Sequence, residues 1–195
     1  MSGTSQKEIY LVISQTGTWL SRLLSIITKA GYNHASISMD PQLRNMYSFG
    51  RLHAYNPILA GFVKESPYFG TFFRFRREAQ CVILRISVTP EQYEQLSEFL
   101  AEMYRHKHRY HYNFLGLVLA AFDVVYQRKN HYYCSEFCRD ALALFSILDA
   151  SGYAGIVKPV DFLESEHVQI IYTGSLWQYA IQYAALQQLP LHAHG

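Results

Sequence analysis

The strongest constraint on the fold is an apolar run that passes directly into a capped helix start. Cys81–Val88 is rich in β-branched residues and predicts a strand. Thr89 follows as a helix cap, with Pro90 at the first helical position and Gln92 at the third, so we expect a helix to about Arg105. The chain therefore combines strands and helices.

The remaining pattern predicts further elements of both kinds. Short apolar or alternating runs predict strands over 9–13, 34–39, 46–49, 71–75 and 168–173, and longer patterns predict helices over about 18–29, 113–126, 174–185 and from Cys134 onward. We expect the helix over 113–126 to be buried because it is so apolar. The pattern assigns no helix or strand to residues 50–70, which we interpret as a lid or substrate loop.

The elements do not alternate strictly, and no repeat or linker marks a boundary. This order predicts one domain over residues 1–195, of the α+β class, with a largely antiparallel sheet packed against helices.

Composition excludes several classes of protein. Half of the residues are hydrophobic and 16% are charged, which excludes a disordered chain. A formal net charge of +2 does not indicate a nucleic-acid partner. Three cysteines cannot form a disulfide framework, and no secretory signal or membrane-spanning run is present, so we expect a soluble, cytoplasmic protein.

Cys134 is the candidate nucleophile. On a helix that starts here, the residues within about 80° of Cys134 form its core-facing stripe, namely Phe137, Cys138, Ala141, Leu142, Phe145 and Leu148. Backbone N–H groups of a first helical turn favour a thiolate and can stabilise the oxyanion of an acyl intermediate. The alternative is that Cys134 is a small apolar filler.

A thiol nucleophile needs a base, and two histidines are candidates. His34 begins an alternating strand and is free to approach Cys134 in space. His131 lies only three residues before Cys134 and is the local rival; it could equally be a polar loop residue.

Two groups of motifs resemble a known family. They are Tyr32–Ile37 with Tyr47–Gly50, and Tyr132–Phe137 about a hundred residues later, followed by 158–162 and 171–176. Together they resemble the circularly permuted branch of the NlpC-like papain-fold cysteine hydrolases, which includes relatives of lecithin retinol acyltransferase. In this branch the histidine precedes the cysteine. The resemblance spans roughly residues 9–180.

The resemblance implies a permuted papain-like fold and a metal-independent, cofactor-free enzyme. It implies that Cys134 attacks an amide or ester carbonyl, in a peptide or acyl-lipid, and that His34 is the general base. The family usually has a polar residue, often glutamate, on the strand after the histidine. Here that strand contains no carboxylate, so we expect Ser48 to orient His34, or Glu65 if its loop folds back.

Other residues have a functional and an ordinary interpretation. We expect Tyr133, beside Tyr132, to contact substrate as a wall or oxyanion helper. His106, His108 and His111 form either a metal cluster or a set of basic residues at a helix end. Cys138 is either a metal ligand or a packing residue. The arginine cluster of Arg74, Arg76 and Arg77 either attracts an anion or lies solvated at a strand edge.

Two further hypotheses remain open. The chain could be a binding module that retains the fold without turnover, or a membrane-surface acyltransferase that uses the arginine cluster.

Overall fold

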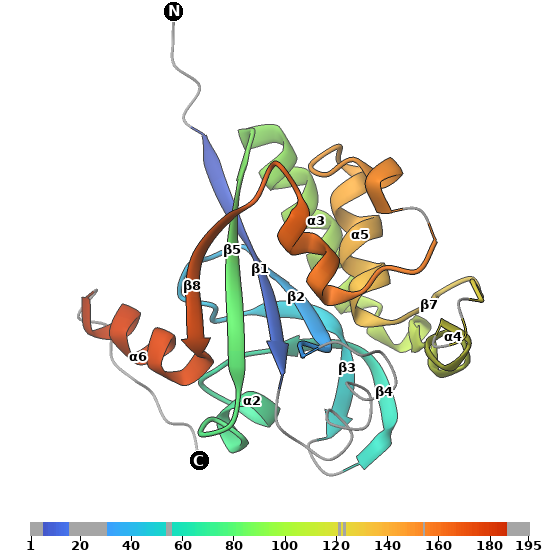
Figure 1. Ribbon diagram of the computed structural model, residues 1–195, viewed down its shortest axis with the longest axis horizontal. Coiled ribbons are helices and arrows are strands. Elements are labelled where there is room, and N and C mark those ends of the chain that lie inside the picture. Colours follow the sequence, from blue (N-terminus) through green and yellow to red (C-terminus); the bar gives the residue numbers. More distant parts are fainter. Residues whose placement is uncertain are drawn as a thin grey trace, which may run out of the picture.

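A single mixed sheet organises the molecule (Figure 1). The computed structural model describes residues 6–15, 31–53, 56–120, 122, 124–153 and 155–186. Within this part, the eight strands are β1 (Lys7–Gln15), β2 (His34–Ser38), β3 (Met46–His53), β4 (Asn56–Glu65), β5 (Gln80–Val88), β6 (His111–Tyr112), β7 (His131–Tyr132) and β8 (Gln169–Ser175). Their order across the sheet is β7-β6-β4-β3-β2-β1-β5-β8. The pair β6–β7 is parallel and the other neighbouring pairs are antiparallel. The α+β class is confirmed.

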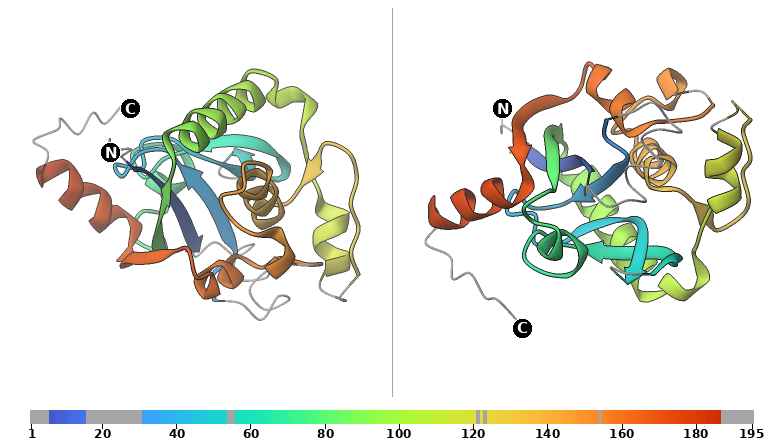
Figure 2. Two further views of the ribbon diagram at one scale, coloured as in Figure 1. Left: turned by 90° about the horizontal axis from the view of Figure 1, so that it is seen from above. Right: turned by 60° about the horizontal axis from the view of Figure 1, so that its bottom comes forward.

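Helices cover both faces of this sheet (Figure 2). The described helices are α2 (Gly70–Arg74), α3 (Pro90–Arg105), η1 (Lys107–Arg109), α4 (Phe114–Ala120), α5 (Cys134–Leu144), η2 (Ala150–Tyr153), η3 (Pro159–Glu164) and α6 (Leu176–Leu186). None of the described helices is long and apolar enough to cross a membrane.

The alternation of β1 shows how the two faces are built. Leu11 and its alternating neighbours lie in the apolar core that also contains the buried residues of α3 and α5. Tyr10 and Val12 lie in the opposite core with Phe72 of α2 and Leu176 of α6. Successive side chains of a strand point to opposite faces, so one strand contributes to both cores.

The start of α3 agrees with the sequence pattern. The N–H of Gln92 donates to Thr89 Oγ1 at 3.1 Å, and the N–H of Thr89 donates to Gln92 Oε1 at 2.9 Å. This reciprocal capping satisfies two N–H groups that the first helical turn leaves without helical partners.

Two expectations for the middle of the chain were wrong. The stretch 71–75 lies largely within helix α2 and not in a strand. It cannot pair with β5 as expected, because β1 and β8 occupy both edges of β5. The stretch 50–70, which we expect to be a lid or substrate loop, contains the end of β3 and the whole of β4.

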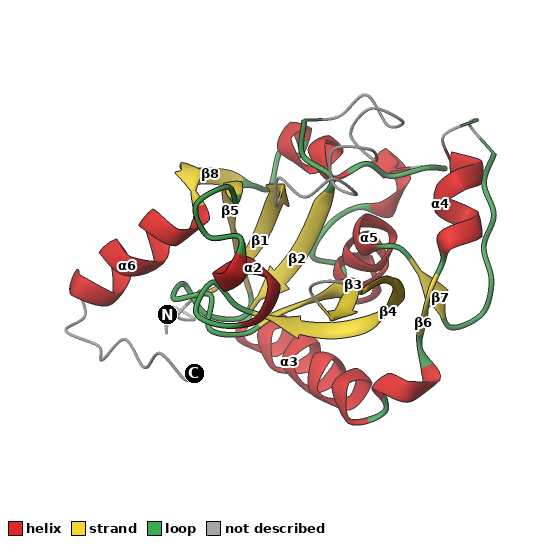
Figure 3. Cartoon of the chain, turned by 90° about the horizontal axis from the view of Figure 1, so that it is seen from below, coloured by secondary structure: helices red, strands yellow, loops and turns green. Residues whose placement is uncertain are grey.

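The apolar stretch after residue 113 also differs from expectation. Helix α4 ends at Ala120, and Gly116 is its one buried residue. The expected buried helix over 113–126 is therefore a shorter, largely exposed one (Figure 3). The helix expected over 18–29 lies outside the described residues.

Candidate active site

Cys134 is the first residue of helix α5, immediately after strand β7. Tyr133 before it is extended, with φ −98° and ψ 167°, so the chain changes from strand to helix at the cysteine. The Tyr133 N–H donates to Glu136 Oε2 at 3.4 Å, which fixes this transition. The thiol is buried, and α5 packs against β2 and β3.

The predicted apolar stripe is buried over Phe137–Leu142, but α5 ends at Leu144, so Phe145, which is partly buried, and Leu148 lie beyond the helix. Polar residues of α5 outside the stripe are buried as well. Ser135 Oγ donates to the Val157 carbonyl at 2.6 Å, and Arg139 Nη1 donates to the Gly155 carbonyl at 3.0 Å. Buried polar groups of this kind need partners, and the 155–157 segment supplies them. Helix α5 is therefore anchored by hydrogen bonds from its polar side as well as by packing of its apolar side.

His34 begins strand β2 and lies beside Cys134. The Cys134 thiol donates to the carbonyl of Asn33, the residue before His34, with Sγ 3.8 Å from the oxygen, and Cys134 lies close enough to His34 to raise the pKa of the imidazole. The structure therefore brings together the two residues that the sequence separates by a hundred positions.

Glu65 holds the other side of the imidazole. Its Oε2 lies 2.7 Å from His34 Nε2 and accepts a further hydrogen bond from Ser36 Oγ at 3.1 Å. The His34 and Glu65 side chains are only 15% and 13% exposed, so water weakens their attraction little. Because Glu65 contacts Nε2, the His34 ring nitrogen that remains to interact with the Cys134 sulfur is Nδ1.

The electrostatics of this pair favour an imidazolium. Burial lowers the pKa of His34, but the charge of Glu65 and the hydrogen bonds to Cys134 and Glu65 outweigh burial and raise the pKa from 6.5 to about 10. The ring therefore binds a proton at neutral pH and holds it firmly.

Ser48 does not orient the imidazole, which corrects the sequence-based expectation. Its hydroxyl is buried and donates to the Ala35 carbonyl at 2.6 Å, joining β3 to β2. The carboxylate comes from one strand further along, because residue 65 ends β4 and does not lie in a loop. The β-forming residues Phe62 and Val63 were the signal for this strand, but Pro57 and Gly61 obscured it.

Gly50 on β3 leaves the space that the His34 and Glu65 side chains occupy. A Cβ at this position would lie 3.1 Å from Glu65 Oε1 and 3.4 Å from His34 Cε1. These contacts are tighter than ordinary packing, so a glycine on β3 lets the carboxylate and the ring approach the backbone closely.

Two tyrosines lie close to the sulfur. Tyr133 is buried, and burial, followed by the charge of Glu136, raises its pKa to about 12. Burial also raises the pKa of Tyr112 well above its ordinary value, with smaller contributions from Cys134, Tyr133 and Glu65. Sequence reasoning missed Tyr112; its placement follows from the parallel pairing of β6 with β7, where it lies opposite Tyr132.

The rival base lies in a different setting. His131 Nδ1 is 2.8 Å from the Lys129 carbonyl, and its ring centroid lies 5.0 Å from that of His111. These contacts tie His131 to the β6–β7 pair, whereas His34 follows Asn33, whose carbonyl accepts from the Cys134 thiol.

The other candidate groups have local partners. His106 Nδ1 lies 2.8 Å from Glu102 Oε1, and the described residues contain no group of three His, Cys, Asp or Glu side chains that could hold a metal. Arg76 lies 4.5 Å over the Phe73 ring. Cys138 is fully buried, and burial raises the pKa of its thiol well above the ordinary value.

A cavity of about 220 Å³ lies beside Glu65. Its lining includes the cationic residues Arg51, Lys64 and Lys107, together with Phe69, Thr71 and Tyr104. Lys64 Nζ and Lys107 Nζ lie 4.5 and 4.8 Å from the centre of the Tyr104 ring, so cations flank the aromatic wall.

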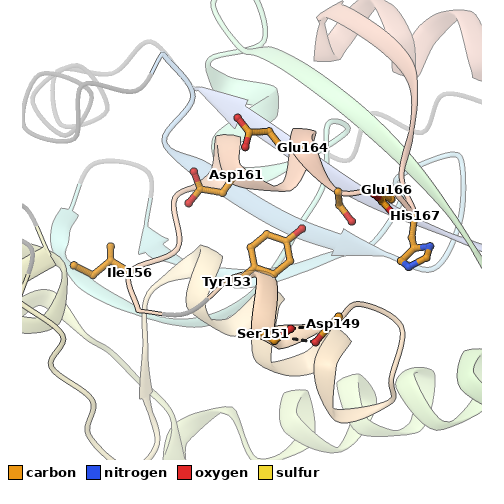
Figure 4. A pocket seen from close by; sticks show the side chains of 9 residues that line it. Asp149, Ser151, Tyr153, Ile156, Asp161, Glu164, Glu166 and His167 are labelled. Atoms are coloured by element: carbon orange, nitrogen blue, oxygen red, sulfur yellow. Dashed lines mark hydrogen bonds between the residues drawn. The ribbon is translucent and has the colours of Figure 1, made fainter.

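A larger hollow of about 500 Å³ lies elsewhere, over η2, η3 and the segment that leads to β8 (Figure 4). Its lining is rich in carboxylates, including Asp149, Asp161, Glu164 and Glu166. Two of these carboxylates serve local structure: Asp149 accepts from Ser151, and Asp161 accepts from the Lys158 N–H. This hollow shares no lining residue with the Cys134–His34–Glu65 group.

Comparisons of the chain with protein-family models, curated proteins and solved structures find no match.

Proposed function

We propose that the protein is a cysteine hydrolase or acyltransferase that cleaves an amide or ester of a peptide or acyl-lipid. The supporting observation is that Cys134 lies at a helix start against the Asn33–His34 segment, while His34 Nε2 lies 2.7 Å from Glu65 Oε2. A nucleophile, a base and a group that orients the base form the arrangement expected of thiol acyl transfer. The order of histidine strand before cysteine helix, with an antiparallel sheet, supports a permuted papain-like fold.

The proposed reaction proceeds through an acyl-enzyme. Cys134 Sγ attacks the carbonyl carbon, while its proton resides on His34 and Glu65 stabilises the imidazolium. The tetrahedral intermediate then expels the amine or alcohol, which takes the proton from His34, and leaves a thioester on Cys134. Water or another acceptor loses a proton to His34 and attacks the thioester carbonyl; the C–S bond then breaks, which releases the acyl group and restores the Cys134 thiolate beside the protonated His34.

The helix start has a second role in this proposal. Backbone N–H groups at the start of α5 point toward the sulfur end of the helix, where negative charge develops on the carbonyl oxygen. Tyr112 and Tyr133 both interact electrostatically with Cys134, and Tyr133 remains our candidate for substrate contact.

Acylation by p-nitrophenyl acetate tests the proposal. We expect intact-mass spectrometry to show one acetyl group on the wild-type protein and none on Cys134→Ala. His34→Ala should acylate about a hundredfold more slowly, since general-base catalysis typically contributes at least that factor.

Cys138→Ala is the matched control, because it removes a thiol from the same helix without touching the proposed base. It should acylate like the wild type. Equal acylation rates for the wild type and His34→Ala would contradict the assignment of His34. A wild-type protein that is never acylated by activated esters would favour the binding module.

The cytoplasm is the proposed location, because a reducing compartment favours free thiols. Cys81, Cys134 and Cys138 are all free.

A further inference from the structure

Helix α4 and the segment after it expose large apolar side chains. We call Phe114, Leu115, Val118, Phe122, Val124 and Val125 the apolar patch; their exposed fractions range from 40% for Phe114 to 74% for Phe122. Single exposed apolar residues are ordinary on protein surfaces, but a cluster in one short segment marks an interaction site.

The patch is held in place by polar contacts on its inner side. The Gly116 N–H donates to Asn113 Oδ1 at 2.9 Å, and Asn113 Nδ2 donates to the Tyr126 carbonyl at 3.0 Å. A Cβ on Gly116 would lie 2.2 Å from Asn113 Nδ2, so only glycine fits against this side chain. The segment is thus built around Asn113, with its apolar side chains outward.

Strands β6 and β7 connect this segment to the rest of the molecule, and α4 stands at the margin of the ribbon (Figures 1 and 3). Phe114, Leu115, Val118 and Phe122 are exposed in this marginal segment, whereas Val124 and Val125 also line a small hollow against Gly155 and Ile156.

Basic residues border the patch on both sides in the sequence. Lys107 and Arg109 precede it, Arg128 and Lys129 follow it, and all four are exposed. Glu102 lies close by but pairs with Arg105 and His106. Between residues 105 and 131 the sequence has one acidic residue, Asp123, which lies outside the described residues.

We infer that the apolar patch docks on the surface of an anionic phospholipid bilayer. Exposed apolar side chains with exposed cations on both sides in the sequence match an interface with negative headgroups outside and acyl chains beneath. A second copy of the chain fits less well, since pairing two patches would bring the basic borders of both copies together. This inference does not depend on chemistry at Cys134.

Vesicle co-sedimentation of the full chain tests the inference. The probes are vesicles of phosphatidylcholine alone and of phosphatidylcholine with phosphatidylserine. We expect binding to the anionic vesicles that weakens as salt rises. The double variant Arg128→Gln/Lys129→Gln should bind about 30-fold more weakly, from the loss of two surface cations near the headgroups. Leu115→Ser/Val118→Ser should bind at least about tenfold more weakly.

Two matched controls show whether the loss of vesicle binding is specific to the apolar patch and its basic borders. Leu144→Ser removes an apolar side chain that is 61% exposed at the opposite end of α5, and Arg76→Gln/Arg77→Gln removes two cations near α2. Both should bind vesicles like the wild type, as should Cys134→Ala. Thermal melting shows whether each variant is folded.

Four results would overturn the inference. They are no binding to anionic vesicles, equal binding to neutral ones, equal loss in either control, and a concentration-dependent dimer that Leu115→Ser/Val118→Ser abolishes. The last result would identify the patch as an interface between copies.

Discussion

Replacing Glu65 by Gln should release the proton that His34 holds. The wild-type pKa of about 10, against 6.5 for a free imidazole, corresponds to roughly 5 kcal/mol in favour of the imidazolium. Burial opposes this preference, and Glu65 and Cys134 supply it. Without the carboxylate charge, burial remains and only Cys134 opposes it, so we expect the pKa of His34 to fall by about two units or more.

The same change should alter how stability depends on pH. A raised pKa stabilises the folded wild type fully below about 6.5, and this contribution is lost as pH rises toward about 10. The free energy of unfolding should therefore fall across this range by up to about 1.4 kcal/mol per pH unit from this group alone. Glu65→Gln should show a smaller fall.

Two measurements check this prediction. NMR titration of the His34 ring gives its pKa, with His34→Gln used to assign the resonance, and urea unfolding at several pH values gives the slope. Glu98→Gln, at an exposed carboxylate on α3, is the control and should behave like the wild type. A His34 pKa that stays near the wild-type value in Glu65→Gln would refute the reasoning.

Three further substitutions test neighbouring contacts. Gly50→Ala should cost about 1–3 kcal/mol of unfolding free energy and lower the His34 pKa, because the new Cβ crowds Glu65 and the ring; unchanged chemical denaturation would contradict the close approach. Ser48→Ala should cost about 1–2 kcal/mol by leaving the Ala35 carbonyl without this donor, yet leave the His34 titration unchanged; a large change in that titration would restore Ser48 as an orienting residue. Ser14→Ala should be neutral or slightly stabilising in thermal melts, since the buried Ser14 hydroxyl has no hydrogen-bond partner among the described residues; a marked loss of stability would show that it has one.

Local signals predicted the parts of the fold that local chemistry decides. Capping by Thr89 and Gln92 located the start of α3, and the alternation after His34 separated the two faces of β2. Which strands pair with each other depends on residues that are distant in the sequence, and this pairing determines the parts of the fold that the sequence did not predict. The aromatic run at 71–75 looks like a strand, but both edges of β5 are taken by strands distant in sequence.

In the candidate site, too, local sequence signals predicted some residues, while contacts between distant segments determined the others. Cys134 could be located because a helix start has a recognisable pattern, and His34 because its strand alternates. Glu65 could not be chosen over Ser48, because the choice depends on how β3 and β4 curve around Gly50. Similarly, apolar composition predicted that α4 is buried, whereas its surroundings leave it exposed.

The short parallel ladder of β6 and β7 has a consequence for engineering and evolution. The His111 N–H donates to the Asn130 carbonyl at 2.9 Å, and the Asn113 N–H donates to the Tyr132 carbonyl at 3.0 Å, so both ends of the intervening excursion are clamped at its base. The base of the excursion is therefore fixed next to Cys134, and we expect that a different hairpin grafted onto this clamp would change the exposed surface and leave the sulfur in register.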